Sequence, residues 1–152
     1  MTQDDIPRVA RLYAEMINEL QEDTHDPYLQ IEAFSILEIE LSLEEDLADP
    51  EARIFVSEAE GAVVAIIVGH IVGTFLPFSN VRRVGQITAA YVQPNYRGRG
   101  LMQKLEQHLV NFFRELGLPY ADLFVHSENT LGRNTWRALG YTTFREQMRR
   151  RI

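Results

Sequence analysis

The sequence contains no cysteine in its 152 residues, which removes several kinds of chemistry at once. Disulfides, thiolate zinc sites and a cysteine nucleophile are excluded, and we expect no metal. No run of eighteen apolar residues occurs, so a transmembrane helix is excluded and no membrane partner is expected. The acidic amino terminus, MTQDDIPRVARLY, differs from the basic and then apolar layout of a secretory signal. A cytoplasmic location is therefore the default expectation.

Positive charge is scarce in the first third of the chain. Residues 1–50 carry 14 acidic residues and two arginines, a net charge of −12, whereas residues 51–152 have a net charge of +5. A cationic ligand is expected to prefer the first part and an anionic ligand the second. Solvated helix faces explain the same distribution, so both interpretations stay open. The net charge of −7 over the whole chain argues against a nucleic-acid partner.

Hydrophobic periodicity predicts one α/β domain over residues 1–152, with a mixed central sheet and about four flanking helices. A loop over 74–83 is expected to expose Phe75, Leu76 and Phe78. The predicted helices cover 5–20, about 30–48, 101–116 and 130–139. The predicted strands are the two apolar runs of 53–73 on either side of Glu60-Gly61, then 84–92, 120–126 and 141–151.

The stretch NYRGRGLMQKL, residues 95–105, places two glycines and two arginines directly before a helix. A strand, a glycine-rich turn and a helix start form a general cradle for phosphate, because free N–H groups and the helix dipole both favour negative charge. Two better-known versions fail. A P-loop needs a Gly-Lys pair, which is absent, and a dinucleotide fingerprint needs glycine where Gln103 stands.

What fits is R-x-x-G, Arg97 to Gly100, after a strand that ends at Val92. Here the sequence resembles the GNAT family of N-acetyltransferases, whose signature [QR]-x-x-G-x-[GA] binds the pyrophosphate of acetyl-CoA through backbone amides. Met102 stands where the family has glycine or alanine. A second family landmark, V-x-x-x-N-x-x-A-x-x-x-Y-x-x-x-G-[FY], is matched in order by Val125, Asn129, Gly132, Trp136, Gly140 and Tyr141, with two identities changed.

The resemblance implies a sheet that is splayed where acetyl-CoA, the co-substrate, lies. The pantetheine arm would pair with the strand that ends at Val92. The family's first strand has no room ahead of Thr2, so it is missing or lies in residues absent from this chain. The residues that the resemblance assigns to acetyl-CoA are Tyr91, Val92, Arg97, Gly98, Arg99, Gly100, Leu101, Met102, Gln103, Asn129 and Trp136.

The implied reaction is direct attack of an amine on the thioester in a ternary complex. The family's usual proton donor is a tyrosine, but Trp136 occupies its place and indole is too weak an acid. His126 and Tyr141 are the catalytic candidates, with His126 as the first choice of base. The thiolate can also leave without a dedicated acid, or Ser127 can supply the proton. Water relaying to Glu128 or to an acid of the first two helices is an equal candidate base, and no base is needed if the amine arrives neutral. His70 is expected to be a satisfied core histidine.

In the family, the first two helices form the rim of the acceptor pocket. Here that segment carries the charge of −12, which favours a cationic acceptor: a polyamine, an aminoglycoside, or a lysine or amino-terminal peptide amine. A non-catalytic acyl-CoA sensor or interaction module on the same fold is the alternative. The resemblance leaves both a monomer and a homodimer open.

Overall fold

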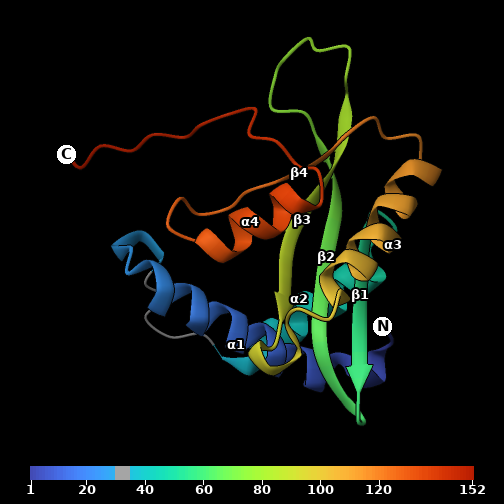
Figure 1. Cartoon of the computed structure of the whole chain (residues 1–152). Coiled ribbons are helices and arrows are strands. Elements are labelled where there is room, and N and C mark those ends of the chain that lie inside the picture. Colours follow the sequence, from blue (N-terminus) through green and yellow to red (C-terminus); the bar gives the residue numbers. More distant parts are fainter. Residues whose placement is uncertain (30–34) are drawn as a thin grey trace.

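The computed structural model describes residues 1–29 and 35–152, which form a four-stranded sheet with helices on both faces (Figure 1). The helices are α1 (Ile6–Thr24), α2 (Ile36–Ala48), α3 (Leu101–Glu115) and α4 (Thr130–Ala138). The strands are β1 (Ala52–Ala59), β2 (Ala62–Gly73), β3 (Arg83–Val92) and β4 (Ala121–Leu123), with 3-10 turns at Gln3–Asp5, Pro27–Leu29 and Pro94–Tyr96.

The sheet has the order β1-β2-β3-β4, and only its β3–β4 pair is parallel. This arrangement confirms the predicted mixed sheet in an α/β fold. None of the helices in the described part of the chain has an apolar run long enough to cross a bilayer.

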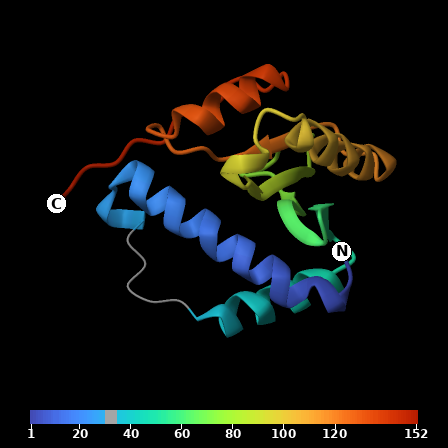
Figure 2. The ribbon, with the colours of Figure 1, turned by 60° about the horizontal axis from the view of Figure 1, so that its bottom comes forward.

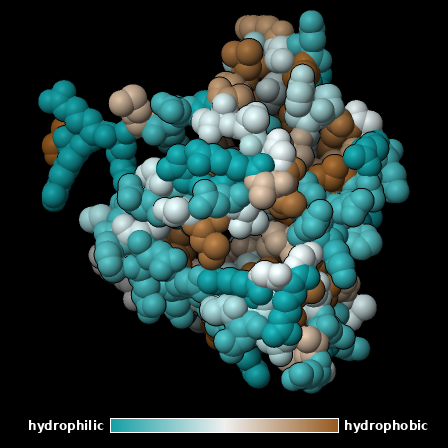
Figure 3. Space-filling view, in the orientation of Figure 1, coloured by the Kyte–Doolittle hydropathy of each residue, from teal (hydrophilic) through white to brown (hydrophobic). Residues whose placement is uncertain are grey.

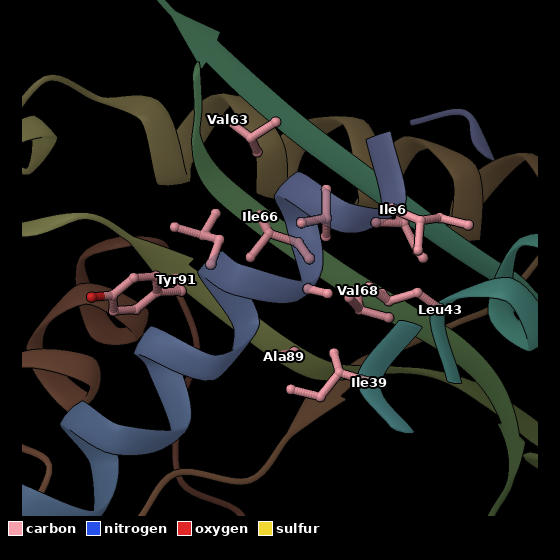
Figure 4. Packing of buried hydrophobic residues seen from close by; sticks show 12 residues of the cluster. Ile6, Ile39, Leu43, Val63, Ile66, Val68, Ala89 and Tyr91 are labelled. Carbon is pink, nitrogen blue, oxygen red and sulfur yellow. The ribbon is translucent and has the colours of Figure 1, made fainter. Parts of the chain in front are cut away.

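The helices form two layers around the sheet, α1 and α2 on one face and α3 on the other (Figure 2). β2 lies in the middle and is buried from Val63 to Val68, as its nearly continuous apolar sequence predicts. Figure 4 shows the core on the α1 and α2 face. Its main residues are Val9, Leu12, Ile39, Leu43, Ile66, Val68 and Tyr91, whereas Ala65, Ile67, Ile87, Val92, Leu105, Leu109 and Phe113 form the core under α3.

Two glycines of the sheet allow α3 to pack directly on the backbone. A Cβ atom added at Gly69 would lie 2.7 Å from Leu109, and one at Gly85 would lie 2.3 Å from Phe113. Both distances are too short for a carbon contact, so the absence of a side chain sets the separation between α3 and the strands.

Replacement of Gly85 by alanine is therefore expected to lower the free energy of unfolding by about 1–3 kcal/mol, because the added methyl group overpacks a rigid ring contact. Urea denaturation measures the change. Gly73→Ala is the matched control, since a Cβ at Gly73 meets no atom within 4 Å. Equal losses for the two variants would contradict the packing explanation.

Several element boundaries differ from those predicted. α1 continues past residue 20 to Thr24, and α2 begins at Ile36, where Ser35 and Glu38 form a capping box. Residues 30–34 of the predicted second helix lie outside the described residues. The strand predicted over 120–126 is confirmed only at 121–123, because the chain then diverges from β3. The loop side chains Phe75, Leu76 and Phe78 are exposed as predicted.

The last predicted strand, 141–151, is wrong: this segment forms no strand in the structure. A strand needs a partner, and the tail instead follows other parts of the surface through side-chain contacts. Phe144 lies 6.2 Å from Phe75, ring centre to ring centre, and Arg149 pairs with Asp26 and lies over Tyr28. The alternating side chains of this segment therefore make contacts along an extended tail and not within a sheet.

Candidate active site

The sheet opens between β3 and β4. Their parallel pairing stops at Ile87 and Leu123, while β3 continues to Val92 with β2 on its other side. The N–H of Gln93 donates to the Val64 carbonyl, 3.0 Å away, so it points toward β2. Because backbone groups alternate along a strand, the N–H groups of Ala90 and Val92 point to the open edge. This edge offers main-chain partners to an extended ligand.

A row of backbone donors follows this edge. The first backbone bond of α3 runs from the Lys104 N–H to the Gly100 carbonyl, at 3.2 Å. Within the part of the chain that the structure describes, the N–H groups from Gly98 to Gln103 have no hydrogen-bond acceptor. Gly98 and Gly100 both have φ of +74°, a left-handed conformation that favours glycine. The row therefore presents donors and the positive end of a helix dipole to an anion.

The side chains at the start of α3 turn away from this row. Leu101 and Met102 are half-buried and pack against the core under α3. The methionine in the usual place of glycine or alanine therefore contributes to packing through its side chain. Its backbone N–H stays in the row of donors.

The two arginines of the motif are engaged within the chain. Arg97 pairs with Glu19 of α1, and its Nε donates to the Val92 carbonyl at 2.9 Å. Arg99 donates to the Asn95 carbonyl at 3.0 Å and lies over the Tyr96 ring. The candidate phosphate site thus has its free donors in the backbone, with two cations beside it.

Glu19 joins α1 to the open edge of β3. One carboxylate oxygen accepts from the Tyr91 hydroxyl at 2.9 Å, and the other pairs with Arg97. Burial and then the neighbouring Glu19 raise the pKa of Tyr91, so the phenol stays protonated. One turn earlier, Glu15 accepts from the Gln93 amide at 3.0 Å. No sequence motif marks Glu15 and Glu19, although their four-residue spacing places them on one face of the helix.

His126, the first candidate base, is held on both nitrogens. Its Nε2 lies 3.0 Å from an oxygen of Asp26, and its Nδ1 accepts from the Glu128 N–H at 3.2 Å. Hydrogen bonds from His126, from the Tyr28 N–H and from Arg149 hold the pKa of Asp26 well below its usual range. This cluster joins the turn after α1, the segment after β4 and the tail.

Tyr141 and Trp136 pack together on the α3 side, with ring centres 5.3 Å apart. The Tyr141 hydroxyl donates to Glu106 at 3.0 Å. Burial, reinforced by the Glu106 charge, raises the pKa of Tyr141. A phenol that already donates to a carboxylate and has a raised pKa is a poor proton donor to a thiolate.

Asn129 caps α4, and its side-chain oxygen accepts from the Gly132 N–H at 2.7 Å. A Cβ at Gly132 would lie 2.9 Å from the Asn129 amide. Glycine in the usual place of alanine therefore leaves room for this cap.

Carboxylates of α1 and of the turn after it lie beside the open edge of β3. In the view of Figure 3, apolar atoms lie in a hollow between the polar surfaces of α1 and α4. Glu15 and Glu19 come from α1, and Asp26 from the turn that follows it. Glu22 and Asp23 are exposed on α1. Acidic residues of α1 and of the turn after it thus lie beside the splayed strands.

Comparisons with known proteins agree with this geometry. The family model described as acetyltransferase (GNAT) family matches residues 13–141. The chain is similar over its full length to a tetramutant of the BH1408 protein from Bacillus halodurans, at 19% identity, 97% coverage of that chain and a TM-score of 0.85. It is also similar over its full length to the aminoglycoside N-acetyltransferase AAC(6')-Iy in complex with CoA, at 16% identity, 91% coverage and a TM-score of 0.81.

A ribosomal-protein-alanine N-acetyltransferase from Brucella melitensis biovar Abortus 2308 is similar over the whole chain, at 18% identity, 95% coverage of that chain and a TM-score of 0.70. These likenesses support the fold, and the family model covers most of the chain. The protein therefore belongs to the GNAT family of acetyl-CoA-dependent acetyltransferases.

Proposed function

We propose that the protein is an N-acetyltransferase that moves the acetyl group of acetyl-CoA to a primary amine of a cationic small molecule or peptide. The observation that carries the proposal is the row of N–H groups from Gly98 to Gln103, which continues into the open edge of β3. A pyrophosphate accepts several hydrogen bonds and carries negative charge, so it satisfies both the donors and the helix dipole.

The open edge fits the arm that joins pyrophosphate to thioester. From Thr88 to Val92, β3 offers five residues without a partner on the β4 side, a length of roughly 16 Å at strand rise. The N–H groups of Ala90 and Val92 can bind an extended arm as an added strand would. The acetyl group would then lie near Thr88, where the edge closes.

Acetyl-CoA supplies an activated acyl group, so the protein needs to orient the amine and manage protons. The amine nitrogen attacks the thioester carbonyl, a C–N bond forms, and the C–S bond breaks as the thiolate leaves. A backbone N–H on the open edge can hold the developing oxyanion. Glu15, Glu19 and Asp26 would attract a protonated acceptor to this edge.

The test combines binding with turnover. Calorimetric titration with acetyl-CoA is expected to show saturable binding of one equivalent per chain. Thiol release is then measured with kanamycin A, spermidine and a peptide that begins with alanine. We expect release above the rate of hydrolysis for at least one of these amines.

Two negative outcomes are distinguishable. Binding without thiol release for any amine would favour the alternative, a non-catalytic acyl-CoA-binding module on the same fold. No binding at millimolar acetyl-CoA would contradict the assignment of the donor row to pyrophosphate.

A further inference from the structure

Three polar side chains form a chain of contacts on the α1 and α2 face of the sheet. Asp46 of α2 lies 2.8 Å from Nε2 of His70, and Nδ1 of His70 lies 3.0 Å from the Thr88 hydroxyl. The side chain of His70 is 25% exposed and that of Asp46 is 22% exposed. The three residues come from α2, β2 and β3, so only the folded chain brings them together.

A β-bulge places Thr88 at the end of the open edge. Val68 pairs with Ala89 and Gly69 pairs with Ile87, so Thr88 is the extra residue of β3. It is also the first residue of β3 after the pairing with β4 ends. Thr88 is exposed, and the proposed arm of acetyl-CoA ends beside it.

The hydrogen bonds fix the tautomer of His70. An ionised carboxylate only accepts, so the contact with Asp46 places the imidazole proton on Nε2. Nδ1 then has a free electron pair that faces the Thr88 hydroxyl. The same hydroxyl lies 3.4 Å from the Val68 carbonyl, a longer and weaker alternative. Thr88 therefore donates to His70 and exposes its own oxygen to the acceptor side.

His126, the other histidine near the place where β3 and β4 separate, has no such electron pair available on Nδ1. The electron pair on Nδ1 of His126 accepts from the Glu128 N–H, so protonation there breaks a hydrogen bond. Protonation of His70 at Nδ1 keeps the Asp46 contact and turns it into an ion pair. Tyr13 of α1 also faces Asp46, and burial raises its pKa, so this phenol stays neutral.

We infer that Asp46, His70 and Thr88 form the proton relay that deprotonates the attacking amine. This inference rests on the proposed function. As the C–N bond forms, the amine proton passes to Thr88 Oγ1 and the hydroxyl proton passes to His70 Nδ1, while Asp46 stabilises the imidazolium. When the C–S bond breaks, the same path returns the proton to the thiolate. A neutral amine and a thioester become an amide and a thiol with no net proton change, and an amine that arrives protonated first loses one proton to solvent.

In this relay Thr88 is the catalytic residue because it touches the amine, and His70 and Asp46 act through it. Variants of all three residues are tested with whichever of kanamycin A, spermidine and the alanine peptide has the highest kcat/KM. His70→Gln is expected to lower kcat/KM at pH 7.5 by about 100-fold or more, the usual size of general base catalysis. Thr88→Val is expected to lower kcat/KM by a similar factor. Thr88→Ser keeps the hydroxyl, so its kcat/KM is expected to stay within about threefold of the wild-type value.

The pH profile separates a relay from a structural role. Asp46→Asn removes the charge that favours imidazolium, so the acid limb of kcat/KM moves to lower pH. His108→Gln is the control, because His108 stacks on Phe55 under α3, on the opposite face of the sheet. The acetyl-CoA dissociation constant, measured by calorimetry, is expected to be unchanged in all five variants.

The outcomes separate the relay from the proposed function. A wild type that binds acetyl-CoA but releases no thiol with any amine contradicts the proposed function. An active wild type with an equally active His70→Gln variant overturns the relay alone. A slow His70→Gln variant overturns it too if Asp46→Asn leaves the acid limb in place, since His70 would then have only a structural role.

Discussion

Replacement of Gly100 by aspartate is expected to weaken the binding of acetyl-CoA strongly without unfolding the protein. The new carboxylate would stand among the free N–H groups at the start of α3, where the pyrophosphate is proposed to lie. Two unit charges about 4 Å apart repel by about 4 kcal/mol at an effective dielectric constant of about 20. After partial screening, we expect the dissociation constant to rise by about 100-fold or more, measured by calorimetry.

The other end of α3 offers a matched control. Gly117 has φ of +73°, close to the +74° of Gly100, and a Cβ at either position meets no atom within 4 Å. Gly100→Asp and Gly117→Asp therefore carry the same backbone strain and the same charge. The helix dipole favours the first aspartate and disfavours the second.

The two variants should therefore differ in opposite directions in acetyl-CoA binding and in melting temperature. Gly100→Asp is expected to bind acetyl-CoA weakly and melt at the higher temperature, whereas Gly117→Asp keeps acetyl-CoA and melts at the lower one. If both variants bind acetyl-CoA equally well, the donor row is not the phosphate site.

Local sequence patterns predicted the parts of the fold that depend on neighbouring residues. The apolar run of β2 and the apolar spacing of α3 identified both elements, and the glycines of the motif marked the turn between β3 and α3. These features are readable because side-chain periodicity and positive φ are properties of a few consecutive residues. The same kind of pattern led to a wrong prediction for the tail, because alternation of residues around Phe144 does not reveal whether a partner strand exists.

The polar contacts of the candidate site could not be predicted from local sequence patterns. Arg97 pairs with Glu19 across 78 positions, and His126 pairs with Asp26 across 100. The bulge at Thr88 depends on how β3 pairs with β2, and neither sequence neighbour of Thr88, Ile87 or Ala89, is a glycine that would signal it. The expected core histidine, His70, therefore became a relay candidate only when the register placed Thr88 beside it.

A lysine in place of Glu19 is expected to raise the KM of spermidine by about 30-fold, if that amine is turned over. The change removes a carboxylate and adds a cation beside the open edge, where the acceptor is proposed to bind. Two charge units at about 8 Å, at an effective dielectric constant of about 40, correspond to about 2 kcal/mol. Steady-state thiol release at low salt gives the KM.

The same substitution should act in the opposite direction on acetyl-CoA. Arg97 loses its partner on α1 and becomes available to the pyrophosphate, so the dissociation constant of acetyl-CoA is expected to stay the same or fall. Glu115→Lys, on the exposed last turn of α3, makes the same change in net charge away from the open edge. If both lysine variants raise the KM of spermidine equally, total charge governs the effect and Glu19 does not mark the acceptor side. A rise confined to Glu19→Lys, with acetyl-CoA binding retained, would place the cationic acceptor between α1 and the open edge of β3.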